Sequence, residues 1–179
     1  MELKHVAVQP NNPSIEGSNR IMSQSMYTRE EKLEALGYPL DHATPEGALV
    51  EAVHVDGNIA YASGQVPFVK DQLMSRGKVP SQVSLEDAKQ AAALCAANVL
   101  RALRVKLGSL DRIDSVIRIT GYVNADPDFC DAHLVINGAS QLIRDVLGDA
   151  GKHARTALGV AQLPLGASTE IEMIARVKE

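Results

Sequence analysis

The sequence contains no tryptophan, and aromatic side chains make up only 3% of its 179 residues. Its formal net charge is −4. Proteins that bind single-stranded nucleic acid combine stacking aromatic side chains with a basic groove, and this composition can hardly build either. We therefore expect no nucleic-acid partner.

Cysteine is also scarce. Cys95 and Cys130 lie far apart in the chain, and each has apolar neighbours in a helical pattern. Neither belongs to a CxxC pair or has a histidine at metal-ligand spacing. The sequence thus predicts two reduced core cysteines and no metal site.

Long hydrophobic runs are missing as well. No apolar stretch approaches the length of a membrane span, and the start, Met1 to His5, lacks the hydrophobic region of a signal peptide. We expect a cytoplasmic protein with no membrane partner. With 179 residues, 45% of them hydrophobic, the chain is long enough to bury the core of one domain.

Residues 1–27 are predicted to be a polar N-terminal arm, and residues 28–179 a single domain that begins with a short helix. Pro10, Pro13 and Gly17 interrupt regular structure in the arm. The pattern leaves open whether the arm is disordered or lies on a neighbouring subunit.

Local signals predict the next elements of the chain. Thr28 and Glu31 form a capping-box pattern, which is typical of a helix start. Alternating apolar residues from Leu49 to Ser63, interrupted by Asp56-Gly57, predict a β-hairpin. The polar stretch Lys70–Pro80 is expected to be a mobile loop.

Two amphipathic helices and a buried strand follow. The first helix is predicted from Ser84 to Gly108 with a face of small apolar residues, and the second from Phe129 to Gly148. Between them, residues 116–123 are apolar on both faces, so both sides of that strand need cover.

The last stretch places charged residues within strands. Period-two alternation predicts strands at 154–160 and 169–177. Arg155 shares its face with small residues, whereas Glu170 and Glu172 point away from the apolar face of their strand. A guanidinium near a carboxylate on a neighbouring strand can bind a small carboxylate and position water. A surface salt bridge between sheet residues explains the same pattern equally well.

The predicted order is strand, strand, helix, strand, helix, strand, strand. Two helices can cover only one face of such a sheet, and the other face carries apolar positions of its own. We therefore expect the chain to associate with copies of itself.

Four short segments, in a fixed order, match a known family. They are Ser63-Gly64-Gln65-Val66-Pro67, Asn137 in the second helix, Ala154-Arg155-Thr156, and Leu163-Pro164 followed by Glu170-Ile171-Glu172. Together they resemble the RidA (YjgF) family of enamine/imine deaminases, sometimes labelled L-PSP endoribonucleases. The resemblance covers residues 45–177 and indicates a divergent branch with an N-terminal extension.

This resemblance implies a chorismate-mutase-like α+β fold, β-β-α-β-α-β-β, with helices on one face of the sheet. It also implies a homotrimer with a central barrel and sites in the clefts between subunits. Arg155 would bind the carboxylate of a small 2-imino acid, and Glu170 would help to place the attacking water. Asn137 and the Ser63-Gly64 segment would line the same cleft.

The implied reaction is hydrolysis of a reactive enamine or imine to a 2-keto acid and ammonia. A fixed arginine orients the carboxylate, and a polar pocket directs water to the adjacent electrophilic carbon. The resemblance implies no cofactor and no metal.

Two positions depart from the family pattern. The family's substrate-side tyrosine falls near Leu49, where there is no tyrosine. The family's cysteine two places after the arginine is Ala157 here, although a backbone carbonyl remains available at that position. One wall of the pocket is therefore expected to differ, and substrate-binding positions are predicted at Leu49 and Ala157.

Other functions remain in competition with the deaminase. The missing tyrosine suggests a non-catalytic trimer that binds a small carboxylate in a regulatory role. The family label alone suggests a ribonuclease, against which the acidic charge argues. Glu172 is expected to be solvated or ion-paired, and His54, His133 and His153 to be structural or exposed.

Overall fold

The structure is a computed structural model that describes residues 27–41 and 49–179. Its elements, in chain order, are helix α2 (Arg29–Ala35), strands β1 (Val53–Asp56), β2 (Ile59–Gln65), β3 (Phe68–Val69) and β4 (Gln72–Leu73), helix α3 (Leu85–Leu107), strand β5 (Ile113–Asn124), helix α4 (Ala132–Leu147), and strands β6 (Ala154–Val160) and β7 (Thr169–Val177). The predicted arm lies outside the described residues, apart from Tyr27.

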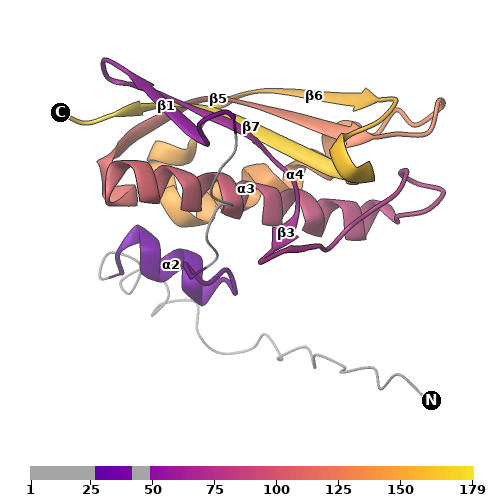
Figure 1. Ribbon diagram of the computed structural model, residues 1–179, viewed down its shortest axis with the longest axis horizontal. Coiled ribbons are helices and arrows are strands. Elements are labelled where there is room, and N and C mark those ends of the chain that lie inside the picture. The colour runs from indigo at the N-terminus through magenta and orange to yellow at the C-terminus, as the bar shows by residue number, and fades with distance from the viewer. Residues whose placement is uncertain (1–26, 42–48) are drawn as a thin grey trace.

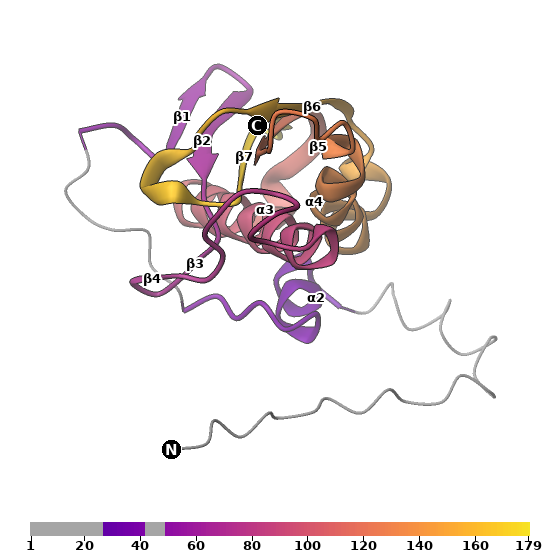
Figure 2. The ribbon, with the colours of Figure 1, turned by 90° about the vertical axis from the view of Figure 1, so that its right-hand side faces the viewer.

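Five strands form one sheet in the order β1-β2-β7-β5-β6. All neighbouring pairs are antiparallel except β5 and β6, which helix α4 connects as a parallel pair. Helices α3 and α4 lie side by side under one face of the sheet (Figure 1). Helix α2 lies on the far side of these two helices (Figure 2). The α+β fold class and the one-sided placement of the helices are thereby confirmed.

Local signals begin and end the helices as the sequence predicts. Thr28 and Glu31 form the reciprocal capping box of α2. Ser84 caps α3 by accepting a hydrogen bond from the backbone N–H of Asp87, and Gly108 ends it in the left-handed conformation. These signals involve residues close in the sequence, so they hold in the folded chain.

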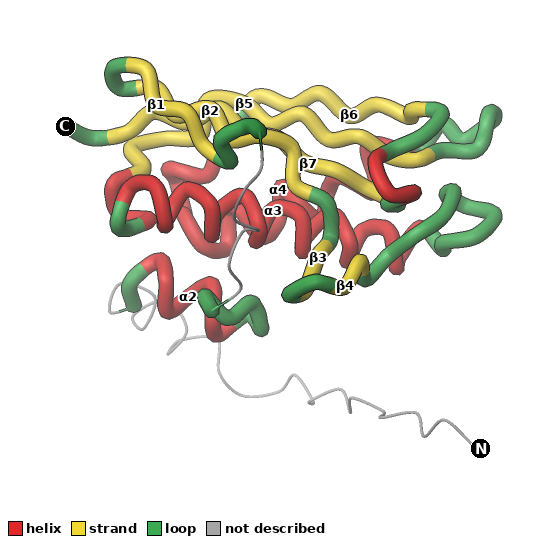
Figure 3. Tube along the Cα trace, viewed as in Figure 1, coloured by secondary structure: helices red, strands yellow, loops and turns green. Residues whose placement is uncertain are grey.

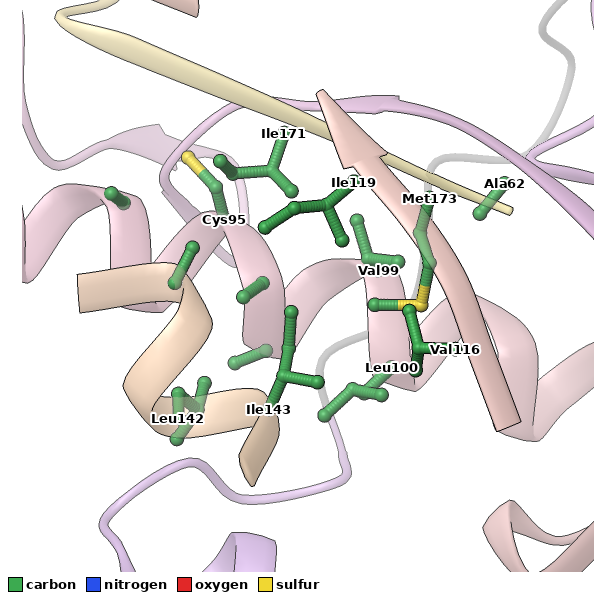
Figure 4. Packing of buried hydrophobic residues seen from close by; sticks show 14 of the residues in the cluster. Ala62, Cys95, Val99, Leu100, Val116, Ile119, Leu142, Ile143, Ile171 and Met173 are labelled. Atoms are coloured by element: carbon green, nitrogen blue, oxygen red, sulfur yellow. The ribbon is translucent and has the colours of Figure 1, made fainter. Parts of the chain in front are cut away.

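The core lies between the sheet and the two helices. Ile119 and Met173 from the sheet meet Val99 and Leu100 of α3 and Ile143 of α4, all of them buried (Figure 4). Six alanines of α3 are buried, which lets the helix approach the sheet closely. The small-residue face predicted for this helix therefore serves packing.

Three boundaries differ from the sequence prediction. The first strand begins at Val53, and Leu49 is fully exposed ahead of it. The stretch Lys70–Pro80 contains β4, which pairs with β3 in a small hairpin, and Asn98 of α3 donates a hydrogen bond to the backbone carbonyl of Phe68 in β3. Helix α4 begins only at Ala132.

The face of the sheet opposite α3 and α4 has no cover from the described residues (Figure 3). Tyr61 and Leu158 point to that side and are 45% and 47% exposed. Strands β1 and β6 form the two edges of the sheet. In the part of the chain that the structure describes, no helix is both long and apolar enough to cross a membrane.

Candidate functional site

Arg155 lies on the helix side of the sheet. Its register partner in β5 is Ile119, which is also the register partner of the buried Met173 in β7. Cross-strand partners share a face of the sheet, so the guanidinium points toward α4. Because β6 is an edge strand, the side chain reaches the helix at the margin of the sheet.

Three oxygens of α4 hold the guanidinium of Arg155. Nη1 donates to Asn137 Oδ1 at 2.9 Å and to Ser140 Oγ at 3.1 Å, and Nη2 donates to the His133 carbonyl at 3.3 Å. Positions 133, 137 and 140 are four and three residues apart, so they lie on one face of the helix. The helix thereby fixes one end of the guanidinium with neutral acceptors.

The salt-bridge alternative finds no support in this geometry. Among the described residues, no carboxylate lies within ion-pair distance of Arg155, and its partners are an amide, a hydroxyl and a carbonyl. The described residues thus leave the positive charge without a neutralising carboxylate. A cation held in this way is suited to an anionic ligand.

His153 extends the same network. Its Nε2 lies 3.0 Å from Ser140 Oγ, and its Nδ1 lies 2.6 Å from the Gly151 carbonyl oxygen. Burial lowers the pKa of His153, and the nearby charges of Arg155 and Arg144 lower it further, against the opposing effect of the Gly151 hydrogen bond. The ring is therefore neutral at physiological pH.

Glu170 lies on the opposite face of the sheet. Its register partner in β5 is Tyr122, which is also paired with the exposed Leu158 of β6. Its pKa is raised, mainly by burial and additionally by the charge of Glu172. A carboxyl group with a raised pKa accepts a proton more readily than an ordinary glutamate, which suits it to proton transfer.

Gly64 makes room for the carboxylate of Glu170. A Cβ at position 64 would overlap Glu170 Oε1 and would lie 2.9 Å from its Cδ. Strand β2 carries a register irregularity between Ala62 and Gln65, at this point of its pairing with β7. The Ser63-Gly64 segment and Glu170 therefore lie together, as the resemblance implies.

The structure brings the predicted site residues into two groups on opposite faces of the sheet. Arg155 and Asn137 form the first group, and Gly64 and Glu170 form the second. Strand β5 also separates β6 from β7, so the expectation that Arg155 and Glu170 stand on neighbouring strands is wrong. Within one protomer the two charged groups do not face each other.

The remaining predicted positions have less direct roles in this protomer. Ser63 donates its hydroxyl to the Glu51 carbonyl at 2.8 Å, which ties β2 to the segment before β1. Ala157 lies in β6 opposite Gly121 of β5 and is partly buried. Leu49 is fully exposed ahead of β1.

Sequence reasoning missed two contributors. Ser140 is three residues after Asn137, so helical spacing alone places it on the same side of α4. Tyr122 donates its hydroxyl to Glu172 Oε1 at 3.3 Å, so that Glu172 is neither fully solvated nor ion-paired. Only the pairing of β5 with β7 reveals this second contact.

The histidines, cysteines and acidic residues of the described ranges were candidates for a metal site. No group of three or more His, Cys, Asp or Glu side chains within residues 27–41 and 49–179 is arranged to hold a metal ion. Cys95 is buried beside Thr169, and burial raises the pKa of its thiol far above the ordinary value. Cys130 is exposed, so the expectation that both cysteines are core residues holds only for Cys95.

Comparison with known proteins agrees with the fold and with the order of the segments. Residues 30–177 match the family described as "YjgF/chorismate_mutase-like, putative endoribonuclease". Protein TCP17 of Trypanosoma cruzi is 34% identical over 146 residues, which cover 81% of this chain and 91% of that protein.

Solved structures show the same architecture. The Agrobacterium tumefaciens protein Atu1372, of unknown function, is 39% identical, with a TM-score of 0.79 over 90% of this chain and 100% of that one. A Shewanella oneidensis protein called a "putative endoribonuclease" is 26% identical, with a TM-score of 0.78 over 84% of this chain and 100% of that one. The chain therefore belongs to the YjgF/chorismate mutase-like family, as the resemblance to RidA (YjgF) proteins predicts.

Proposed function

We propose that the protein is a hydrolase that converts small 2-imino or enamine acids to 2-keto acids and ammonia. The observation that carries this proposal is the guanidinium of Arg155, a cation that α4 fixes at one end and leaves without an anionic partner among the described residues. The raised pKa of Glu170 supplies the second requirement, a carboxyl group that holds a proton more readily than an ordinary glutamate.

The free donors of Arg155 suit a carboxylate. A guanidinium has five N–H donors, of which the contacts to Asn137, Ser140 and the His133 carbonyl use three. The donors left are the Nε–H and one N–H of Nη2. Two donors on one rigid plane can bind both oxygens of a carboxylate and so fix the orientation of the substrate.

In the proposed reaction, Glu170 handles the protons. Its carboxylate accepts a proton from water as the water oxygen bonds to the imine carbon, and it passes this proton to the imine nitrogen, which gives a carbinolamine. Glu170 then accepts the hydroxyl proton of the carbinolamine as the C=O bond forms and the C–N bond breaks, and it passes that proton to the departing nitrogen, which leaves as ammonia. Water and the imino acid thus give the keto acid and ammonia with no other reactant.

Since Arg155 and Glu170 lie on opposite faces of the sheet, we propose that each site takes Arg155 from one protomer and Glu170 with Gly64 from its neighbour. The uncovered sheet face, with Tyr61 and Leu158 exposed, and the edge strand β6 support association with another copy. The family resemblance favours a homotrimer. Light scattering of the purified protein measures the number of protomers directly.

The activity test supplies the imine in solution. An amino-acid oxidase generates 2-imino acids, and keto-acid release is followed with and without the protein. We expect the protein to accelerate release, Arg155→Ala to abolish the acceleration, and Arg112→Ala to leave it unchanged. Arg112 is an exposed arginine whose guanidinium donates to the carbonyl of Lys178, a residue outside the proposed site. Equal activity of wild type and Arg155→Ala would refute the proposal.

A trimer that binds a small carboxylate without turnover is the second candidate. It rests on Leu49, which stands where the family has a tyrosine and is fully exposed in this protomer. This candidate predicts that pyruvate raises the melting temperature through Arg155 while imines persist. Turnover by the wild-type protein excludes it.

A further inference from the structure

The side chain of His153 is held in one tautomer. Nδ1 lies 2.6 Å from the carbonyl oxygen of Gly151, and a carbonyl can only accept, so Nδ1 carries the hydrogen. In the neutral ring Nε2 must then be an acceptor. The Gly151 carbonyl thereby makes Nε2, the ring nitrogen that faces Ser140, a hydrogen-bond acceptor.

Ser140 is oriented by its two neighbours. Its hydroxyl lies 3.0 Å from the acceptor Nε2 of His153, so it donates its hydrogen to that nitrogen. Its oxygen accepts from Nη1 of Arg155 at 3.1 Å. The hydrogen bonds therefore run in one direction, from Arg155 to Ser140, from Ser140 to His153, and from His153 to Gly151.

The first and last groups in this series of hydrogen bonds fix its direction. Arginine has no acceptor, and the Gly151 carbonyl has no donor, so no other arrangement satisfies all four groups while His153 is neutral. The hydroxyl hydrogen of Ser140 is bonded to His153, so the lone pairs of the serine oxygen face Arg155. The hydroxyl therefore cannot turn its hydrogen toward the guanidinium. The direction of the Ser140 hydroxyl is thus set by His153, while Arg155 receives the effect through the serine oxygen.

We propose that Ser140 and His153 are positioning residues that aim the guanidinium of Arg155 at the carboxylate of its ligand. Asn137 alone would leave Nη1 with one side-chain contact from an exposed amide, which can rotate about its own side-chain bonds. The second contact, through Ser140, removes this freedom. The consequence for turnover rests on the proposed function, whereas the orientation of Arg155 does not.

A serine 3.0 Å from a histidine nitrogen also resembles a nucleophile with its base. The contact from Arg155 argues against that role, because a cationic donor on the serine oxygen withdraws the electron density that an attack needs. A serine nucleophile would react with phenylmethylsulfonyl fluoride and gain the mass of the sulfonyl group. Modification of Ser140 in intact protein would overturn the positioning role.

The test uses Ser140→Ala, which removes the hydroxyl, and Ser140→Thr, which keeps it. Gln141→Ala serves as the matched control, because Gln141 is the next residue of α4 and contacts Asp145 instead of Arg155. Pyruvate is the probe for carboxylate binding. Losing one charge-assisted hydrogen bond is expected to weaken pyruvate binding about tenfold in Ser140→Ala, with recovery in Ser140→Thr and no change in Gln141→Ala.

Kinetics separate positioning from a general structural defect. A carboxylate contact that is equal in substrate and transition state changes KM and leaves kcat nearly constant. We expect Ser140→Ala to raise KM about tenfold with kcat within about twofold of wild type. A drop in kcat with constant KM would contradict the assigned role.

Nuclear magnetic resonance reads the network without any ligand. Imidazole nitrogen shifts of wild type, assigned with His153→Gln, are expected to show the Nδ1–H neutral tautomer at pH 7.5, and the side-chain hydrogens of Arg155 are expected to exchange faster in Ser140→Ala. An Nε2–H tautomer, or unchanged exchange, would overturn the inference. If these spectra agree but no imine is hydrolysed, the proposed function fails while the positioning network stands.

Discussion

Replacing Gly64 with alanine tests whether the place of the Glu170 carboxylate matters. Gly64 is not among the glycines with positive φ, so its backbone accepts a side chain without strain. The added Cβ would lie 2.9 Å from Glu170 Cδ and would overlap Oε1, whereas ordinary contact begins at 3.4 Å. The carboxyl carbon must therefore retreat by about 0.5 Å, and Oε1 by on the order of 1 Å.

This displacement should harm activity more than stability. The clash falls on the end of a flexible side chain, so overpacking is expected to cost about 1 kcal/mol of unfolding free energy. A misplacement on the order of 1 Å at a reacting group can lower the rate about hundredfold. We therefore expect Gly64→Ala to be folded and to lose about hundredfold in kcat/KM for imine hydrolysis.

Thermal melts and keto-acid release measure the two effects on the same preparations. In a Glu170→Ala background the clash partner is gone, so Gly64→Ala should cost almost no stability there. A folded Gly64→Ala protein with wild-type kcat/KM would refute the role of Glu170 at this position.

Three further predictions concern stability. The raised pKa of Glu170 means that the folded chain holds this proton more tightly than the unfolded chain. Ionisation of Glu170 therefore lowers the unfolding free energy as pH rises above the ordinary pKa of 4.5. Glu170→Gln should melt higher than wild type at pH 7.5 but not at pH 4. The lowered pKa of His153 means that the unfolded chain takes up this proton before the folded chain as pH falls below 6.5. Thermal melts between pH 7.5 and 5.5 should therefore show a smaller loss of stability for His153→Gln than for wild type. Equal losses would contradict the buried neutral ring. A Cβ at Gly138 would overlap the backbone carbonyl of Lys89 where α4 packs on α3. Gly138→Ala should therefore lower the unfolding free energy by about 2 kcal/mol or more in urea denaturation. A loss under about 0.5 kcal/mol would mean that the two helices move apart at little cost.

The sequence was sufficient for the elements that depend on local signals. Thr28 and Ser84 cap their helices as predicted, and the order of strands and helices along the chain is confirmed except for the small hairpin of β3 and β4. Helix caps and apolar periodicity depend on residues a few positions apart, so tertiary contacts elsewhere in the chain do not change them. The four family segments likewise identify the fold, because their order and spacing are preserved in the sequence.

The arrangement of the site could not be predicted in the same way. Strand alternation shows that Arg155 and Glu170 each point to the side of their own strand opposite to the adjacent residues. It does not show whether the two side chains lie on the same face of the sheet. Their relation depends on β5, which lies between β6 and β7 and fixes the register of both. Such pairing joins residues far apart in the chain, and only the folded structure reveals it.

The network around Arg155 was partly within reach of the sequence. Ser140 follows Asn137 at helical spacing, and His153 precedes Arg155 by two residues, which places both near the same guanidinium. Their hydrogen bonds depend on the contact between α4 and β6, and no local pattern encodes that contact.

Subunit complementation tests most directly whether each site takes Arg155 from one protomer and Glu170 from another. Arg155→Ala and Glu170→Gln proteins, each inactive alone, are co-expressed with different tags, and the mixed oligomers are purified. In a mixed trimer of either composition, one of the three sites joins an intact Arg155 with an intact Glu170, so about a third of wild-type activity should return. Mixed oligomers that remain inactive would show that both residues must come from the same chain, which contradicts the proposed site.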